Sequence, residues 1–154
     1  MRTKVVLVVT AALLLGADAP KGRPVDKDRD ALQGKWRSTS LTRDGEKLDG
    51  AKQWTELKVD KDRISWEEST LKGDFGETAN VPFSYKLDPS KDPKTIDLTW
   101  TKYARKGKKL LGIYRLRGDE LTICVSWKDT ARPEKFESER GSGHQLVTLK
   151  RVEE

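Results

Sequence analysis

Few residues of this 154-residue chain could carry catalytic or metal chemistry. His144 is the single histidine and Cys124 the single cysteine, and a zinc site needs more nitrogen or sulfur ligands than these two supply. A catalytic Ser–His–Asp set needs neighbours that position the histidine, and the sequence around His144 offers none. We therefore expect His144 at the surface, and Cys124 as a buried, inert thiol because it lies in an apolar stretch.

The acidic residues near the N-terminus lack the spacing of a calcium loop. Asp26, Asp28 and Asp30 resemble the opening of such a loop. Ala31 stands where the loop needs glycine, and Arg37 stands where it needs its last glutamate. We interpret the three aspartates as the acidic first turn of a short helix, where negative charge is favourable.

Glu67 and Glu68 form a second candidate pair of carboxylates. Neighbours in a strand point to opposite faces, so these two side chains cannot face each other across a sugar as the carboxylates of a glycosidase do. We therefore predict a protein that is not an enzyme and that needs no metal and no cofactor.

A basic stretch at residues 102–109 carries five cations and no acidic residue. Such cations in one hairpin could bind an anionic polymer, and the alternative is a solvated loop. Its cations, the candidate anion contacts, are Lys102, Arg105, Lys106, Lys108 and Lys109. We expect an envelope polymer or an anionic lipid to be the accessible partner of an exported protein, and no nucleic acid.

The N-terminal segment has the pattern of a secretory signal. Arg2 and Lys4 precede an apolar run over residues 5–17, and small residues follow it. The run is shorter than the ~20 apolar residues that span a membrane. We predict a signal peptide over residues 1–19, with cleavage after Ala17 as the competing choice and an uncleaved anchor as the alternative. Export to the periplasm, envelope or exterior follows, without a transmembrane domain in the mature form.

Residues 20–30 are predicted as a linker that runs into a short helical turn at 26–32, and a single domain follows over 31–154. In that domain apolar and polar residues alternate in short runs separated by Gly- or Asp-containing turns. The predicted strands cover residues 35–43, 54–60, 63–69, 81–87, 95–102, 109–116, 120–127 and 144–151. A sandwich or a barrel would fit such strands, and a barrel leaves no open edges. We predict an all-β fold, a single antiparallel up-and-down β-barrel of about eight strands.

The barrel interior holds the candidate ligand-binding residues. Alternation turns five aromatic side chains inward: Trp66, Phe83, Tyr85, Trp100 and Tyr114. An eight-stranded barrel is either filled by its side chains or holds one small ligand. The aromatic rings could fill it, or Trp66 and Trp100 could wall a mouth while Tyr85 and Tyr114 supply polar handles. We favour a barrel that binds a small apolar or amphipathic ligand; the alternative is a filled barrel that acts through its loops.

The first predicted strand carries a recognisable signature. The run Leu32-Gln33-Gly34-Lys35-Trp36 resembles the Gly-x-Trp start of lipocalins. With it, an ordered set of segments resembles a lipocalin-like domain of exported planctomycete proteins: 85–91, 96–98, 111–114, 118–124, 132–136, 141–143 and 149–151. The resemblance implies a calycin-type barrel and no activity.

The resemblance also implies structural roles for Gly34, Trp36 and Arg151. In lipocalins the tryptophan of the first strand packs near an arginine of the last strand. Arg151 has the same parity as Val147 and Leu149, so it can point inward beside Trp36. The alternative is a solvated terminal residue.

Overall fold

The computed structural model describes residues 24–48, 54–68, 79–102, 104–128 and 131–153. In chain order its elements are α1 (Pro24–Leu32), β1 (Gly34–Arg43), β2 (Glu46–Leu48), β3 (Trp54–Asp60), β4 (Arg63–Glu68), β5 (Ala79–Asp88), β6 (Thr95–Trp100), β7 (Lys109–Arg117), β8 (Glu120–Ser126) and β9 (His144–Arg151). The helix begins two residues before the predicted turn, so residues 24–30 of the predicted linker are helical. The predicted signal peptide lies outside the described residues.

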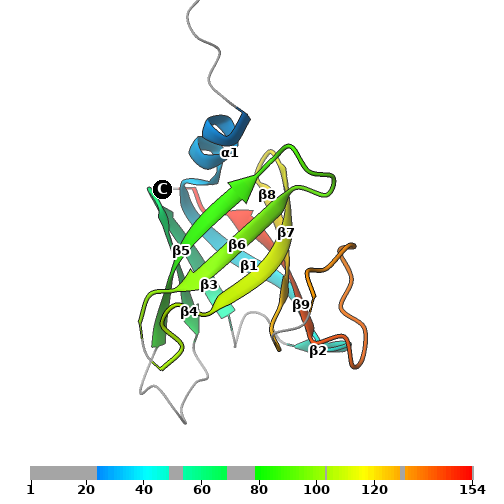
Figure 1. The fold of residues 1–154 in the computed structure, drawn as a ribbon. Coiled ribbons are helices and arrows are strands. Elements are labelled where there is room, and N and C mark those ends of the chain that lie inside the picture. Colours follow the sequence, from blue (N-terminus) through cyan, green and yellow to red (C-terminus); the bar gives the residue numbers. More distant parts are fainter. Residues whose placement is uncertain (1–23, 49–53, 69–78, 103, 129–130, 154) are drawn as a thin grey trace, which may run out of the picture.

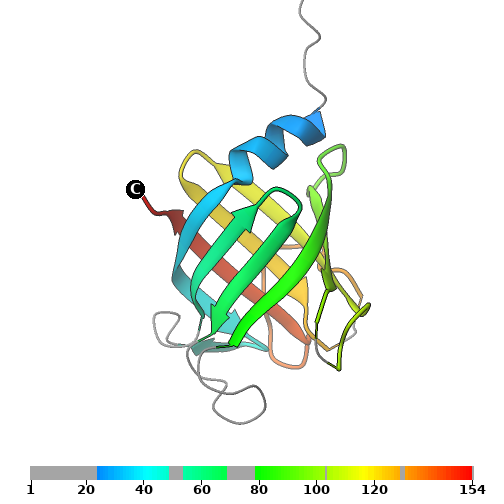
Figure 2. The same cartoon turned by 90° about the vertical axis from the view of Figure 1, so that its left-hand side faces the viewer.

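Eight of the strands form a closed antiparallel barrel, as the alternation predicts (Figures 1 and 2). From β3 to β9 each strand pairs with the next, and β1 pairs with both β3 and β9. The short strand β2, which the sequence did not predict, pairs with the last residues of β1. Gly- or Asp-containing turns separate the strands, as expected; those at Asp44-Gly45, Lys61-Asp62 and Gly118-Asp119 each have at least one residue at positive φ.

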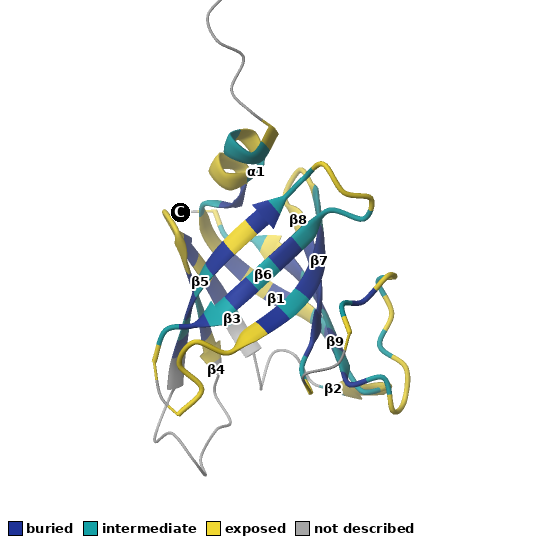
Figure 3. Ribbon diagram, viewed as in Figure 1, coloured by how far each residue is buried: buried dark blue, intermediate teal, exposed yellow. Residues whose placement is uncertain are grey.

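Buried residues alternate with more exposed ones along the strands of the barrel (Figure 3), and the buried apolar side chains form one core inside it. The largest of the nearly inaccessible ones are Trp36, Trp66, Phe83 and Tyr114. Apolar burial of this kind is the main stabilising contribution in a domain this size. Gly112 makes the packing possible at one point, since a Cβ there would lie 2.7 Å from Val125 Cγ1.

A segment at residues 131–139 packs on the outer face of β7 and β8. Arg132 anchors it: Nη1 donates to the Gly112 carbonyl at 2.6 Å and Nη2 pairs with Asp97 at 2.7 Å. The thiol of Cys124 donates to the Glu137 carbonyl at 3.3 Å. This cover explains why Cys124 is fully buried, as predicted, on a face that should meet solvent. Burial raises the pKa of this thiol to about 11.

Helix α1 lies across one end of the barrel, which we call the helix end; we call the opposite end the loop end (Figures 1 and 2). Leu32 is buried there, and its carbonyl accepts a 2.9 Å hydrogen bond from Trp36 Nε1. The guanidinium of Arg151 lies 4.1 Å from the Trp36 ring centroid and donates to the carbonyls of Ala31 and Gln33 at 2.6 and 2.7 Å. The packing of Arg151 against Trp36 that the resemblance implies is therefore present.

Gly34 separates the helix from the first strand at this end. Its φ of +109° lies in a region that side-chain-bearing residues rarely adopt. A Cβ there would also stand 3.4 Å from Arg151 Nη1, in ordinary contact. The sharp entry into β1 therefore depends on glycine mainly through its backbone conformation.

Candidate functional site

The five predicted interior aromatics divide between the two ends of the barrel. The hydroxyl of Tyr85 donates to the Lys61 carbonyl at 2.7 Å, and that of Tyr114 donates to Asp28 at 2.5 Å, both at the helix end. Burial raises the pKa of both tyrosines. Their hydroxyls are thus held by protein groups, and a ligand would have to displace these bonds.

The other three, Trp66, Phe83 and Trp100, lie further toward the loop end. All three are buried, and the rings of Phe83 and Trp100 are 4.6 Å apart between centroids. Trp100 is the last residue of β6 and forms the boundary between the packed interior and the loop end. Of the five predicted residues, only Trp100 lines one of the cavities described here.

That cavity, which we call the loop-end pocket, has a volume of about 270 Å³. Its lining residues come from β6, β7, the hairpin between them and the two residues that follow β8: Trp100, Arg105, Lys108, Leu110, Trp127 and Lys128. The indoles of Trp100 and Trp127 are 6.5 Å apart between centroids. The hairpin between β6 and β7 brings its cations to the same place.

Positive charge surrounds the two indoles. The guanidinium of Arg105 lies 5.6 Å from the Trp100 ring and 5.8 Å from the Trp127 ring, and that of Arg43 lies 4.9 Å from the Trp127 ring. All three distances are typical of cation–π contacts. Lys128 pairs with Asp44 at 2.8 Å, and hydrogen bonds from Lys128 and Gly143 lower the pKa of Asp44.

Two cations of the pocket have no such partner. Among the described residues, no carboxylate lies within ion-pair distance of Arg105 or of Lys108. Among the described residues, the lining includes no carboxylate, imidazole, thiol or hydroxyl that could serve as a nucleophile or general acid in the usual way. The positive charge of these lining residues can attract an anion.

Two buried polar groups near the loop end lack hydrogen-bond partners in the described structure: Trp100 Nε1 and Gln145 Nε2. Trp100 is 4% exposed and Gln145 is 1% exposed. The other side of the Gln145 amide is used, since its Oε1 accepts from Arg43 Nε at 2.7 Å. A buried donor without an acceptor is costly, so each marks a place where an acceptor would be favourable.

The predicted basic hairpin is exposed along its length. Lys102, Arg105, Lys106, Lys108 and Lys109 are all exposed, and none forms an ion pair with another described residue. Only two of the five, Arg105 and Lys108, line the loop-end pocket. Tyr103, the aromatic residue of this stretch, lies outside the described residues.

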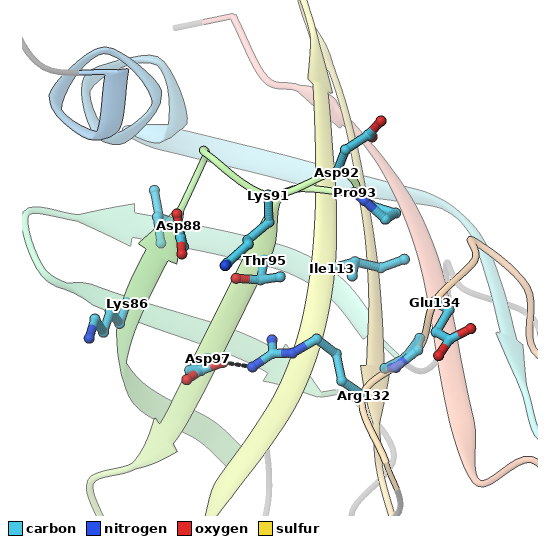
Figure 4. A pocket seen from close by; sticks show the side chains of 12 residues that line it. Lys86, Asp88, Lys91, Asp92, Pro93, Thr95, Asp97, Ile113, Arg132 and Glu134 are labelled. Atoms are coloured by element: carbon cyan, nitrogen blue, oxygen red, sulfur yellow. Dashed lines mark hydrogen bonds and ion pairs between the residues drawn. The ribbon is translucent and has the colours of Figure 1, made fainter.

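A larger groove of about 780 Å³ lies on the outside of the barrel, between the β5–β6 turn and the segment 131–139 (Figure 4). The ion pair of Arg132 with Asp97 crosses it. The side chain of Lys91 points toward Thr95. Asp88 and Glu134 lie on opposite sides of the groove. Hydrogen bonds from Ser90 lower the pKa of Asp88. With carboxylates and cations mixed along its walls, the groove favours neither charge in a ligand.

The acidic residues of the described structure do not form a metal site. In the described ranges no three His, Cys, Asp or Glu side chains gather where they could hold a metal ion. Asp28 pairs instead with Lys94 at 2.7 Å, and His144 is half-buried at the start of β9. No helix in the described part of the chain is long and apolar enough to cross a membrane.

Comparison of the chain with protein-family models, with curated proteins and with solved structures finds no match. Sequence reasoning singled out Trp100, Arg105 and Lys108 but missed Trp127 and Arg43. Trp127 continues the inward parity of Val125 by one step beyond β8, which is the signal that could have found it.

Proposed function

We propose that this protein is a lipocalin-like binding protein, not an enzyme, that binds an anionic, amphipathic ligand at the loop end of its barrel. One observation carries the proposal: the Arg105 guanidinium lies against two indoles and has no carboxylate partner among the described residues. A cation held on aromatic faces pairs favourably with an anion, since charge-assisted hydrogen bonds are about twice as strong as neutral ones.

The packed interior supports the loop end as the place of binding. Trp66, Phe83 and Tyr114 are nearly inaccessible, and the polar handles of Tyr85 and Tyr114 bond to other protein groups. Alternation alone would place the ligand in the interior of the barrel. We propose instead that it binds in the loop-end pocket, beside Trp100.

Binding is tested by calorimetric titration at low salt with two anions of different size, 8-anilinonaphthalene-1-sulfonate and heparin. We expect saturable binding of at least one, weakened at least about tenfold in Arg105→Gln and weakened by salt. Lys106→Gln is the matched control, because it removes an exposed charge from the same hairpin but does not line the pocket. If neither anion binds, or if both variants lose binding equally, the loop-end pocket is not a binding site.

A second candidate function is attachment to an anionic envelope polymer through the whole basic hairpin. The five cations at 102–109 favour it, because all are exposed and none forms an ion pair with another described residue. Replacing Arg105, Lys106, Lys108 and Lys109 by Ser should then flatten the salt dependence of heparin binding, with little change in stability. Indifference of the wild-type protein to heparin at low salt would exclude this function.

Export and membership of the lipocalin-like family complete the proposal. The N-terminal signal pattern supports export, and the contact between Trp36 and Arg151 supports the family. A contact of this kind between the first and last strands is the feature that the resemblance implies, and the closed eight-stranded barrel is compatible with it.

A further inference from the structure

We infer that the ligand of the loop-end pocket is a small, flat aromatic monoanion, such as an aryl carboxylate; this inference rests on the proposed binding function. It names a class of ligand that the charge of the pocket alone does not, because fatty acids and polyanions also carry negative charge. Three properties of the pocket select this class: its volume, its aromatic walls and its charged groups.

The small volume of the pocket excludes a ligand with a long alkyl chain. Drug-sized ligands occupy cavities of ~300–1,000 Å³, and this one measures about 270 Å³. Its floor is closed because Trp100 packs on Phe83 and both are buried, with Leu110 beside them in the core. An alkyl tail of a dozen carbons has no channel to enter and would lie on the surface.

The walls of the pocket suit a planar ring. The indoles of Trp100 and Trp127 stand 6.5 Å apart and are inclined by 57°, and rings pack well at such distances. The Arg105 guanidinium, itself planar, lies against both indoles. An aryl group can pack on the exposed side of Trp127 while Arg105 pairs with its anionic substituent.

The charged groups of the pocket are hydrogen-bond donors. Among the described residues, neither Arg105 nor Lys108 has a carboxylate partner. A carboxylate supplies two acceptor oxygens and one negative charge. A ligand cation would compete with Arg105 for the indoles and meet the charges of Arg43 and Lys108, so the pocket selects against it.

The test compares 2-naphthoate with its neutral isostere 2-naphthamide, with laurate and with heparin, by calorimetry on the purified protein. We expect 2-naphthoate to bind with a Kd on the order of 100 µM, and the amide and laurate to bind at least about tenfold more weakly. Trp127→Leu and Arg105→Gln should each weaken naphthoate binding about tenfold, while Lys106→Gln should leave it within about twofold. Trp127 is half-buried and packs against the edge of the core, and leucine keeps an apolar side chain at this position.

The outcomes separate this inference from the function on which it rests. Binding of laurate or heparin with no binding of naphthoate would overturn the aromatic class and leave anion binding intact. Equal binding of naphthoate and naphthamide would show that the ring binds without its charge, which also overturns the inference. Failure of every anion would remove the binding function itself. Arg105→Lys gives a further readout, since loss of the planar guanidinium should weaken naphthoate binding more than heparin binding.

Discussion

The hydroxyl of Tyr114 in β7 donates a 2.5 Å hydrogen bond to Oδ2 of Asp28 in α1. The same oxygen accepts from Lys94 Nζ at 2.7 Å, just before β6 begins. One carboxylate thus attaches the helix to two neighbouring strands. Asp28 is therefore a structural residue at the helix end of the barrel.

Replacement of Tyr114 by Phe keeps the buried ring and removes this donor. We expect the free energy of unfolding to fall by about 1–3 kcal/mol in urea denaturation, because the lost bond is to a charged group. A double-mutant cycle with Asp28→Asn tests the assignment. If the two single effects simply add, the hydroxyl and the carboxylate are not coupled and the assignment is wrong.

Arg151 should contribute to stability through more than its charge. Arg151→Ala removes a cation–π contact, worth roughly 0.5–2 kcal/mol, and two hydrogen bonds to carbonyls at the end of α1. We expect a loss of about 2–4 kcal/mol in urea denaturation, and only partial recovery in Arg151→Lys, since an ammonium cannot present a planar fork to both carbonyls. Lys150→Ala, an exposed neighbour in β9, is the control and should change stability by less than about 0.5 kcal/mol.

Cys124 makes stability sensitive to alkaline pH. Burial raises the pKa of its thiol to about 11, above the ordinary value near 9, so the folded state holds this proton more tightly than the unfolded state. Its contribution is complete below pH 9 and is lost as the pH rises through 11, by at most about 3 kcal/mol. Urea denaturation at pH 8 and pH 11 should show a smaller alkaline loss in Cys124→Ala than in the wild type. Equal losses in the two proteins would rule out this titration.

Export is checked on the mature protein. If the N-terminal segment is a signal peptide, N-terminal sequencing of the exported fraction should begin between Asp18 and Gly22. A protein that reaches the exterior with Met1 intact would instead carry the segment as an anchor.

Alternation along the strands was enough to predict the barrel. Phe83, Tyr85 and Leu87 occupy one face of β5 and are buried, whereas Lys86 on the other face is exposed. A period of two fixes the face of each residue, and Gly or Asp turns fix the order of the strands, so local patterns determine most of this fold.

Alternation could not predict what covers the outside. Ile113 and Cys124 have the outward parity, and both are almost inaccessible. Their cover is a segment without regular structure, held by Arg132 bonds to the carbonyl of Gly112 and to Asp97. Contacts of this kind join residues that are not neighbours in the chain and have no regular spacing. The sequence pattern therefore does not predict them.

The pocket shows the same division. Arg105 and Lys108 stand out in the sequence as part of a basic stretch, and Trp100 stands out as an inward aromatic at a strand end. That Arg105 lies on Trp100 and Trp127 together depends on the ends of β6 and β8 lying two strands apart in a curved sheet. The spacing of these residues in the sequence does not predict that they lie close together in space.

The ladder between β1 and β9 sets a condition on how this chain folds. It pairs Trp36 with Arg151 and Arg43 with Gln145, so the contacts that close the barrel are also among those most distant in sequence. Closing so long a loop carries a large entropic cost before any contact repays it, and such topologies fold slowly. A chain truncated before His144 would present two unpaired strand edges, on β1 and β8, to any neighbouring chain. We therefore expect such truncated chains to self-associate, because β9 lies between β8 and β1 and its loss exposes an edge of each.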